Sequence, residues 1–289
     1  MLNADRRRLK ANKTISPYNQ PASKSSFHKS DLSEIQKKKE THSPIPLKSI
    51  MAKTFLTAAW RNLLMANYAI EPAVLKPYLP CYTELDTYNG VHYVSLVGFL
   101  FQNTKVGGIG FPFHRTFEEV NLRFYVRYKE GGAWKRGVVF MKEMVPRRMI
   151  TFVANTVYKE KYATHPMKHL WQTEGDNLKV EYYWKVKSDW NYLKAVADKK
   201  ATPLVEGSEE AFITEHYWGY THVSNTCTGV YEVAHPQWNI HKVNHFDVHC
   251  STALLYGPQF EEALSVPPVS VFLADGSPIQ VLKGGQLFS

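Results

Sequence analysis

One stretch of fifteen residues, His114–Tyr128 (HRTFEEVNLRFYVRY), constrains the fold of this chain more than any other. Side chains alternate between the two sides of a β-strand, so a strand here has two contrasting faces. One face is apolar after its first residue and carries Glu118, Val120, Leu122, Phe124, Val126 and Tyr128. The other face mixes charged and aromatic side chains and carries Phe117, Glu119, Asn121, Arg123, Tyr125 and Arg127. The apolar face must pack on another layer. The polar face either meets water or lines a polar cavity, and we expect the cavity.

The positive charge of the chain is concentrated at its N-terminus. Residues 1–50 hold eleven of the 35 Lys and Arg residues but only four of the 26 Asp and Glu residues, which leaves a nearly neutral remainder. They are also rich in Lys, Ser and Pro and poor in large apolar residues, which predicts a disordered basic N-terminal extension. The remaining residues, 51–289, are numerous enough to form a single domain with its own core. Because the basic charge lies in the tail, we expect no nucleic-acid binding.

Cysteine usage and hydropathy indicate a protein of a reducing compartment. The three cysteines, Cys81, Cys227 and Cys250, are odd in number and form no C-x-x-C pair, so neither a disulfide framework nor a zinc ribbon is expected. No apolar run reaches the roughly 18 residues of a membrane span. Arg6–Arg8 are not followed by the apolar segment of a secretory signal. These features predict a cytoplasmic protein without a membrane span.

The order of strand and turn signals predicts the fold class. The turn Tyr88-Asn89-Gly90 lies between apolar runs and is a strong hairpin signal. Strand-like segments follow along the rest of the chain, whereas a single helical turn is expected at 71–80 and short helices at 149–158, at 209–217 and at 259–264. Strands and helices do not alternate regularly. The sequence therefore predicts an α+β fold with a largely antiparallel, curved, barrel-like sheet and a few short helices.

Motifs for cofactors and metals are weak. The glycines at 107–110 are followed by Pro112 and His114 rather than by a helix, which does not fit a phosphate loop. His241, His245 and His249 are spaced four apart, but in a strand this spacing separates neighbours by roughly 13 Å. That is too far for bonds of about 2 Å to one zinc ion. We expect no cofactor and no metal.

Several charged residues lie in or beside apolar segments, where a charge must be paired or solvated. These residues are Arg61, Glu119, Glu143, Arg147, Arg148 and Glu160. They are either structural ion pairs or the lining of a cavity in which burial prepares a group for proton transfer. The run Glu215–Tyr220 adds His216 as an acid/base candidate, although Glu215 and His216 point about 100° apart if the segment is helical.

The sequence also resembles a known family. Seven segments carry this resemblance, in this order along the chain: WRNLLMANY, YVSLVGFLF, PFHRTFEEVNLRFYVR, RGVVFMKEMVPRR, GSEEAFITEHYWGY, EVAHPQW and ALLYGPQFEEAL. Over about residues 54–282 these segments resemble the YqjF-like family of uncharacterised proteins. Through that family the chain resembles the acetoacetate-decarboxylase-like fold, a curved antiparallel sheet that closes over an internal cavity. The resemblance implies that Phe117-Glu118-Glu119 opens a long strand and that Glu119 is the cavity carboxylate.

The lysine chemistry of the decarboxylases has no clean counterpart. Those enzymes use a Schiff-base lysine activated by a cationic neighbour. The segment Tyr158–Tyr162 contains Lys159 and Lys161 but lacks the expected proline and paired lysines. Pro146 is followed by Arg147 and Arg148, and arginines stay protonated and form no imine. We therefore expect no Schiff-base decarboxylation.

These observations lead to one main functional hypothesis and two alternatives. The main hypothesis is a protein that binds or transforms a small carbonyl or carboxylate compound, with Glu119 as general acid or base. Arg61 or Arg147 would hold an anionic group, and His114 would lie at the cavity mouth. The other predicted ligand contacts are Arg123, Arg148, Glu160 and His216. The alternatives are a small-molecule binding protein without turnover and a structural or interaction protein whose polar strand face is wet. The oligomeric state is left open.

Overall fold

The computed structural model describes residues 53–157 and 159–288. The predicted disordered extension, residues 1–50, lies outside the described residues and stays a prediction. Among the described helices, none is long and apolar enough to cross a membrane.

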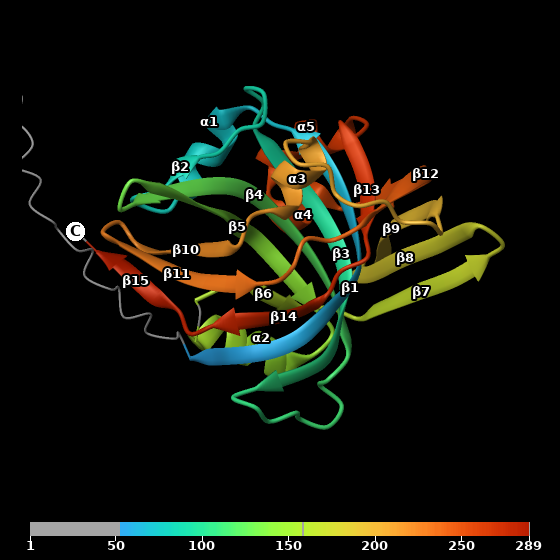
Figure 1. Ribbon diagram of the computed structural model, residues 1–289, viewed down its shortest axis with the longest axis horizontal. Coiled ribbons are helices and arrows are strands. Elements are labelled where there is room, and N and C mark those ends of the chain that lie inside the picture. Colours follow the sequence, from blue (N-terminus) through green and yellow to red (C-terminus); the bar gives the residue numbers. More distant parts are fainter. Residues whose placement is uncertain (1–52, 158, 289) are drawn as a thin grey trace, which may run out of the picture. The chain divides into compact units, whose positions relative to one another are not determined.

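The centre of the fold is a closed β-barrel (Figure 1). Its strands follow one another around the barrel in the order β14, β11, β10, β5, β4, β3 and β1, and the pairing of β1 with β14 closes the ring. Neighbours in the ring are antiparallel except β10 and β5, which pair in parallel. The bounds are β1 (Thr54–Ala69), β3 (Tyr93–Val106), β4 (Phe117–Glu130), β5 (Ala133–Val145), β10 (Trp218–Ser224), β11 (Cys227–Ala234) and β14 (Pro278–Leu282). Closure leaves these strands without an open edge along most of the ring.

The same sheet continues past β1 into a second layer, which projects to one side of the barrel (Figure 1). This layer contains β13 (Ser270–Ala274), β12 (Ile240–His249), β9 (Asp189–Asp198), β8 (Asn177–Val186) and β7 (Met167–Glu174). The short strands are β2 (Glu84–Leu85) on β4, β6 (Tyr162–Thr164) on β5 and β15 (Gly285–Phe288) on β11. The helices are α1 (Pro72–Leu75), η2 (Lys76–Tyr78), α2 (Arg148–Val157), α3 (Glu209–Thr214), α4 (Thr252–Tyr256), η3 (Pro258–Phe260) and α5 (Glu261–Ser265). The predicted fold class, a largely antiparallel curved barrel with a few short helices, is confirmed.

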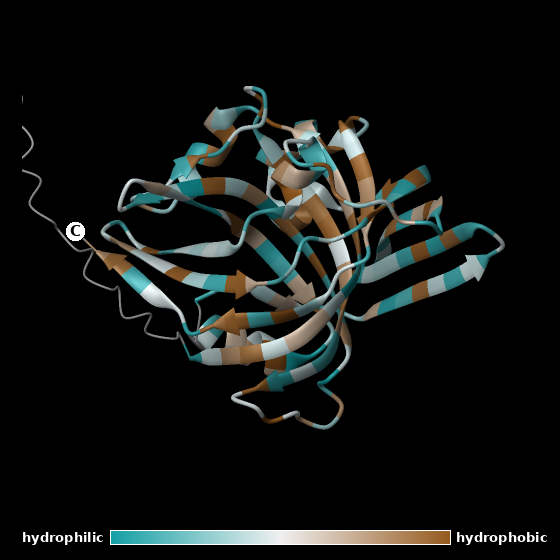
Figure 2. Ribbon diagram, in the orientation of Figure 1, coloured by the Kyte–Doolittle hydropathy of each residue, from teal (hydrophilic) through white to brown (hydrophobic). Residues whose placement is uncertain are grey.

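Strand β4 separates two apolar clusters, as its two-faced sequence predicts. Val120, Leu122, Phe124 and Val126 belong to a cluster that includes the second-layer residues Tyr182 and Trp184. Phe117 and Tyr125, from the other face, belong to a cluster inside the barrel. Hydrophobic and hydrophilic residues alternate along the barrel strands in Figure 2. The polar face of β4 therefore points into the barrel and not into bulk water.

The segment before β10 differs from the sequence prediction. The expected helix at 209–217 ends at Thr214, although it begins as expected, with Ser208 Oγ accepting a hydrogen bond from the Ala211 amide at 3.1 Å. Residues Trp218–Ser224 form strand β10, which was not predicted. Pairing with β5 and β11 fixes this aromatic, glycine-containing run as a strand, because context in a sheet outweighs local preference.

Candidate functional site

A cavity of about 260 Å³ lies inside the barrel. Most of its wall is apolar and includes Leu56, Trp60, Phe101, Phe117 and Val233. Helix α2 contributes Met149, Ile150 and Ala154 to the wall. Concave, mostly apolar cavities with a few convergent polar groups are the usual form of small-molecule sites.

Three carboxyl groups converge on this apolar cavity. Glu119 comes from β4, Glu143 from the neighbouring strand β5 and Glu160 from the chain just before β6. Their exposed fractions are only 2%, 2% and 8%. Among the described residues that line the cavity there is no lysine and no arginine. The carboxyls therefore have no cationic partner in the wall itself.

Glu119 is fixed by two hydrogen bonds. The Asn121 side-chain amide donates to Oε1 at 2.9 Å, and the Tyr162 hydroxyl donates to Oε2 at 2.9 Å. Tyr162 is itself positioned by α2, because Asn155 bonds the Tyr162 backbone amide at 2.7 Å and its carbonyl oxygen at 3.0 Å. The pairing of β6 with β5 places Tyr162 opposite Glu143. The tyrosine thus lies between two of the acids.

Glu160 is held by side chains of strands β10 and β11. Thr221 Oγ1 donates to Glu160 Oε1 at 2.7 Å, and the Tyr231 hydroxyl also bonds this carboxyl. The Tyr231 ring lies over Gly219, the residue paired with it in β10, where an added Cβ would come within 2.2 Å of the ring. Glycine is therefore required at 219 for the tyrosine to take this position.

Burial controls the protonation of all three acids. It raises the pKa of Glu119 to about 7, against the hydrogen bonds from Asn121 and Tyr162. It raises the pKa of Glu160 to about 7, against those from Thr221 and Tyr231. For Glu143, burial and then the charges of Glu160 and Glu119 raise the pKa well above its ordinary value. A cluster of this kind holds and exchanges protons near neutral pH.

The structure places the other predicted contacts in different regions. His114 lines the cavity, with Nδ1 at 2.8 Å from the Pro112 carbonyl oxygen. Arg61 donates instead to the Gly276 carbonyl at 3.2 Å and does not line the cavity. Arg147 and Arg148 are exposed at the start of α2. The structure therefore offers no support for an anion clamp made by Arg61 or Arg147, because neither side chain enters the cavity.

The two lysines considered for imine chemistry are also outside. Lys159 and Lys161 are both exposed, and Lys161 lies 5.8 Å from the centre of the Tyr78 ring. The three histidines of β12 are dispersed: His241 is buried with Nδ1 at 2.9 Å from the Asp198 carbonyl oxygen, whereas His245 and His249 are exposed. Over residues 53–157 and 159–288, no group of three or more potential ligands is arranged to hold a metal ion.

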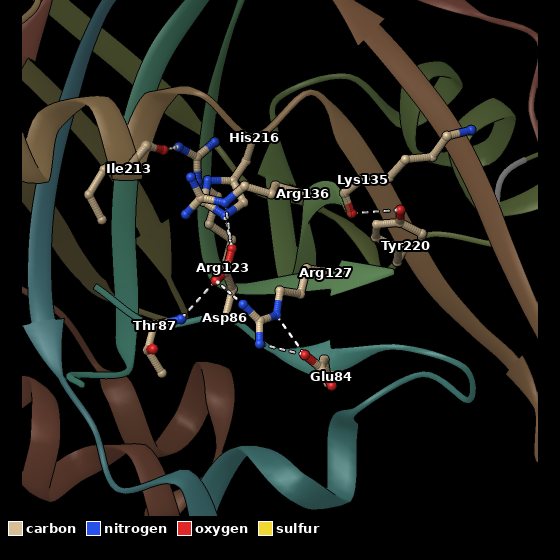
Figure 3. Close-up of polar contacts among 10 residues, drawn as sticks. All are labelled: Glu84, Asp86, Thr87, Arg123, Arg127, Lys135, Arg136, Ile213, His216 and Tyr220. Carbon is tan, nitrogen blue, oxygen red and sulfur yellow. Dashed lines mark hydrogen bonds and ion pairs between the residues drawn. The ribbon is translucent and has the colours of Figure 1, made fainter. Parts of the chain in front are cut away.

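Arg123 and His216 lie in a second polar region of the barrel interior (Figure 3). There His216 Nε2 is 3.2 Å from Asp86 Oδ2, and the Arg136 guanidinium donates to the same oxygen at 2.6 Å. Burial tends to raise the pKa of Asp86, but the bonds from His216 and Arg136 outweigh it and lower the pKa to about 2. Burial lowers the pKa of His216 to about 4, so its imidazole is neutral at pH 7. The structure therefore separates the predicted residues into two groups.

Sequence reasoning missed two tyrosines of the cavity. Tyr162 was noted only as part of the lysine-bearing segment, and its alternation with Glu160 was the available signal. Tyr231 gives no local signal, since its role depends on the glycine opposite it in β10. Glu143 was recognised as a charge in an apolar segment but was not assigned to the site.

The closed barrel with an internal carboxyl-bearing cavity defines a protein of the acetoacetate-decarboxylase-like fold. A structure of acetoacetate decarboxylase from Legionella pneumophila matches with a TM-score of 0.55 and 15% identity, over 82% of this chain and 88% of that one. The enduracididine biosynthesis enzyme MppR complexed with pyruvate matches with a TM-score of 0.59 and 12% identity, over 85% of this chain and 94% of that one. At these identities the likeness shows the fold alone.

The chain belongs to the DUF2071 family, described as an uncharacterized conserved protein, whose model matches residues 57–278. It is also similar to the uncharacterized protein YqjF of Bacillus subtilis (strain 168), with 28% identity over 170 residues. That match covers 57% of this chain and 67% of the relative. The predicted membership of the YqjF-like family is therefore confirmed.

Proposed function

We propose that the cavity of about 260 Å³, hereafter the outer cavity, binds a small carbonyl compound and that its carboxyl groups move a proton to and from the carbon next to the carbonyl. The observation that carries this proposal is the convergence of Glu119, Glu143 and Glu160 on an apolar cavity, with the pKa of Glu119 and of Glu160 raised to about 7. Acids and bases are most effective when their pKa lies near the working pH. MppR binds pyruvate in the structure named above, which supports a small carbonyl ligand for a barrel of this kind.

The contacts around Tyr162 suggest how the proton would move. Burial and the charges of Glu160 and Glu119 raise the pKa of Glu143 well above its ordinary value, which favours its protonated form, and the Tyr162 hydroxyl lies between Glu143 and Glu119. In its ionised form, Glu119 takes the proton from carbon as the C–H bond breaks, and the electron pair moves to the carbonyl oxygen. A protonated carboxyl, Glu143, gives that oxygen its proton, so the product is an enol. Return of a proton to carbon completes an exchange or an isomerisation.

This route uses no lysine. Lys159 and Lys161 are exposed, and no lysine is among the described residues of the cavity wall. We therefore expect borohydride reduction in the presence of 2-oxo acids to leave the protein unlabelled. A covalent adduct on Lys159 or Lys161, located by peptide mass analysis, would contradict the proposed route.

The direct test is deuterium exchange in D₂O, followed by proton NMR, with a panel of small ketones, aldehydes and 2-oxo acids. We expect exchange at the carbon next to the carbonyl to exceed the rate in buffer for at least one compound. Glu119→Gln keeps the shape but removes the base, and should slow that exchange by about 100-fold or more. The matched control is Glu118→Gln, because Glu118 is the next residue on β4 but faces away from the cavity and bonds His169 Nδ1 at 2.7 Å.

The same experiment separates the proposal from a binding protein without turnover. If compounds of the panel bind, as seen by line broadening that Glu119→Gln alters, but none exchanges deuterium, then the cavity binds without catalysis. If no compound either binds or exchanges, the proposal of a small carbonyl ligand is wrong.

A further inference from the structure

Arg123 is a buried cation without a carboxylate partner. Its exposed fraction is 8%, and it lies on the inward face of β4. Its Nη2 donates to the Ile213 carbonyl at 3.4 Å and lies 3.8 Å from Met65 Sδ, while Nε is buried with no hydrogen-bond partner. Arginine stays protonated in proteins, so burial cannot neutralise it. A buried charge of this kind requires a counter-charge or strong hydrogen bonds.

The nearby acid is already engaged by other cations. Asp86 accepts from Arg136 at 2.6 Å, pairs with His216 Nε2 at 3.2 Å and lies 3.9 Å from the guanidinium of Arg127 (Figure 3). No ion pair joins Arg123 to any carboxylate of residues 53–157 or 159–288. Arg123 therefore has only longer-range partners, namely the Tyr125 ring, whose centre is 5.7 Å from its guanidinium carbon, and the charge of Glu119, and no carboxylate contacts it directly.

A small cavity adjoins this charge. It has a volume of about 20 Å³ and is lined by Arg123 and His216, with Trp60, Trp218, Tyr231 and His235 among the other residues. That is room for one water-sized occupant. Two of the residues that line it also carry a buried nitrogen without a hydrogen-bond partner, His216 Nδ1 and Trp60 Nε1. Trp60, Tyr231 and Val233 line both this inner cavity and the outer one, so the two are neighbours.

We propose that the inner cavity is a site for a small monovalent anion, held by the guanidinium of Arg123 and by His216. The anion is either a free halide ion, which is closest in size to the water-sized space, or a ligand whose carboxylate places one oxygen there while its body fills the outer cavity. His216 keeps its Nε2–H bond to Asp86 and takes up one proton at Nδ1, which then donates to the anion. The groups facing this imidazole are Asp86, Arg136, Arg123 and the ring of Tyr125 at 4.8 Å, with Phe212 from α3.

The competing occupant is a single water molecule. A water would accept a hydrogen bond from Arg123 Nε and donate one to neutral His216 Nδ1. His216 would then take up no proton, and the Tm would not depend on which salt is present. The free-ion form of the proposal does not depend on the proposed carbonyl chemistry, whereas the ligand-carboxylate form rests on a carbonyl compound bound in the outer cavity.

The test uses thermal unfolding of the full chain at pH 7 and constant ionic strength, with sodium gluconate exchanged for chloride, bromide or pyruvate. Binding of an anion at ten times its Kd should raise the Tm by about 3 °C. Arg123→Gln should abolish the rise. Arg147→Gln, which removes an exposed arginine, should retain it. If only longer carboxylates, such as pyruvate, give an Arg123-dependent rise, the anion belongs to a ligand of the outer cavity.

Diffraction keeps the proposal testable if Arg123→Gln fails to fold. Crystals of the unmodified protein grown in bromide should show anomalous density next to Arg123 Nε and His216 Nδ1. Histidine NMR in bromide or pyruvate should show His216 protonated at a pH where it is neutral in gluconate. Equal melting in all salts and carboxylates, or density that fits only a water in the cavity, would overturn the proposal.

Discussion

The two polar regions inside the barrel both contain buried carboxyl groups, but the pKa of these groups is shifted in opposite directions. In the outer cavity Glu119 is 2% exposed, lacks a cation in the lining, and has a pKa raised to about 7. At the other region Asp86 is 4% exposed, bonds His216 and Arg136, and has a pKa lowered to about 2. Burial tends to raise the pKa of both acids, but for Asp86 the hydrogen bonds from His216 and Arg136 reverse the direction of the shift. The comparison shows that burial alone moves a carboxyl pKa toward neutral pH, as the proposed proton transfer requires, whereas directly bonded partners keep a buried carboxyl ionised.

The comparison predicts opposite pH dependences of stability. Glu119 and Glu160 bind protons more tightly in the folded protein than in the unfolded chain, where the ordinary value is 4.5. Their contribution to the free energy of unfolding is therefore fully present below pH 4.5 and is lost as the pH rises through about 7. Asp86 stabilises the folded protein at pH values above its ordinary pKa of 3.8, and this stabilisation is lost as the pH falls through about 2.

The largest expected effect is on the outer cavity. Glu119→Gln should reduce the fall in the free energy of unfolding between pH 5 and pH 8 by on the order of 3 kcal/mol, because it removes a carboxyl that must ionise while buried. Urea unfolding at the two pH values measures this fall. Glu118→Gln is the control, since its carboxyl bonds His169 and the pKa of Glu118 is lowered despite burial. An unchanged fall in Glu119→Gln would show that Glu119 is not the acid that burial perturbs.

The next largest effect is on the paired region. Asp86→Asn should lower the free energy of unfolding at pH 7 by about 2 kcal/mol, because it removes the carboxylate that accepts from Arg136 and His216. The matched control is Glu84→Gln, which breaks the exposed Arg127–Glu84 pair at 2.6 Å and should cost less than about 1 kcal/mol. Urea unfolding of both variants measures the difference. Equal losses would indicate that the buried position of Asp86 adds nothing.

The smallest effect refines the proton relay. Tyr162→Phe removes the hydroxyl that donates to Glu119 Oε2 at 2.9 Å and should cost about 1 kcal/mol of carboxylate stabilisation. This raises the pKa of Glu119 by about 0.7 pH units. The infrared band of protonated carboxyl groups, recorded against pH, measures the shift. Tyr88→Phe should leave the band unchanged, because its hydroxyl donates to the exposed Gly207 carbonyl at 3.1 Å.

The sequence by itself determined the general fold and one element of the site. The two-residue alternation in His114–Tyr128 identified a strand whose two faces pack into two different apolar clusters. The pair Asn89-Gly90 identified the turn before β3. Both signals are local, because side-chain direction and turn conformation depend on residues next to each other in the chain. Glu119 was therefore correctly assigned to the inward face of β4.

Only the tertiary structure decided which neighbours of Glu119 complete the cavity. Glu143, Glu160 and Tyr231 meet it because β5, β6 and β11 take particular registers and because β1 pairs with β14 to close the ring. The register of β1 also shifts between Arg61 and Leu64, where Asn62 has a φ of 50°. This irregularity leaves Trp60 in the cavity wall and Arg61 outside it. Alternation tells which residues share a face, but the face that turns inward, and the groups it meets there, depend on pairing with strands far away in the sequence.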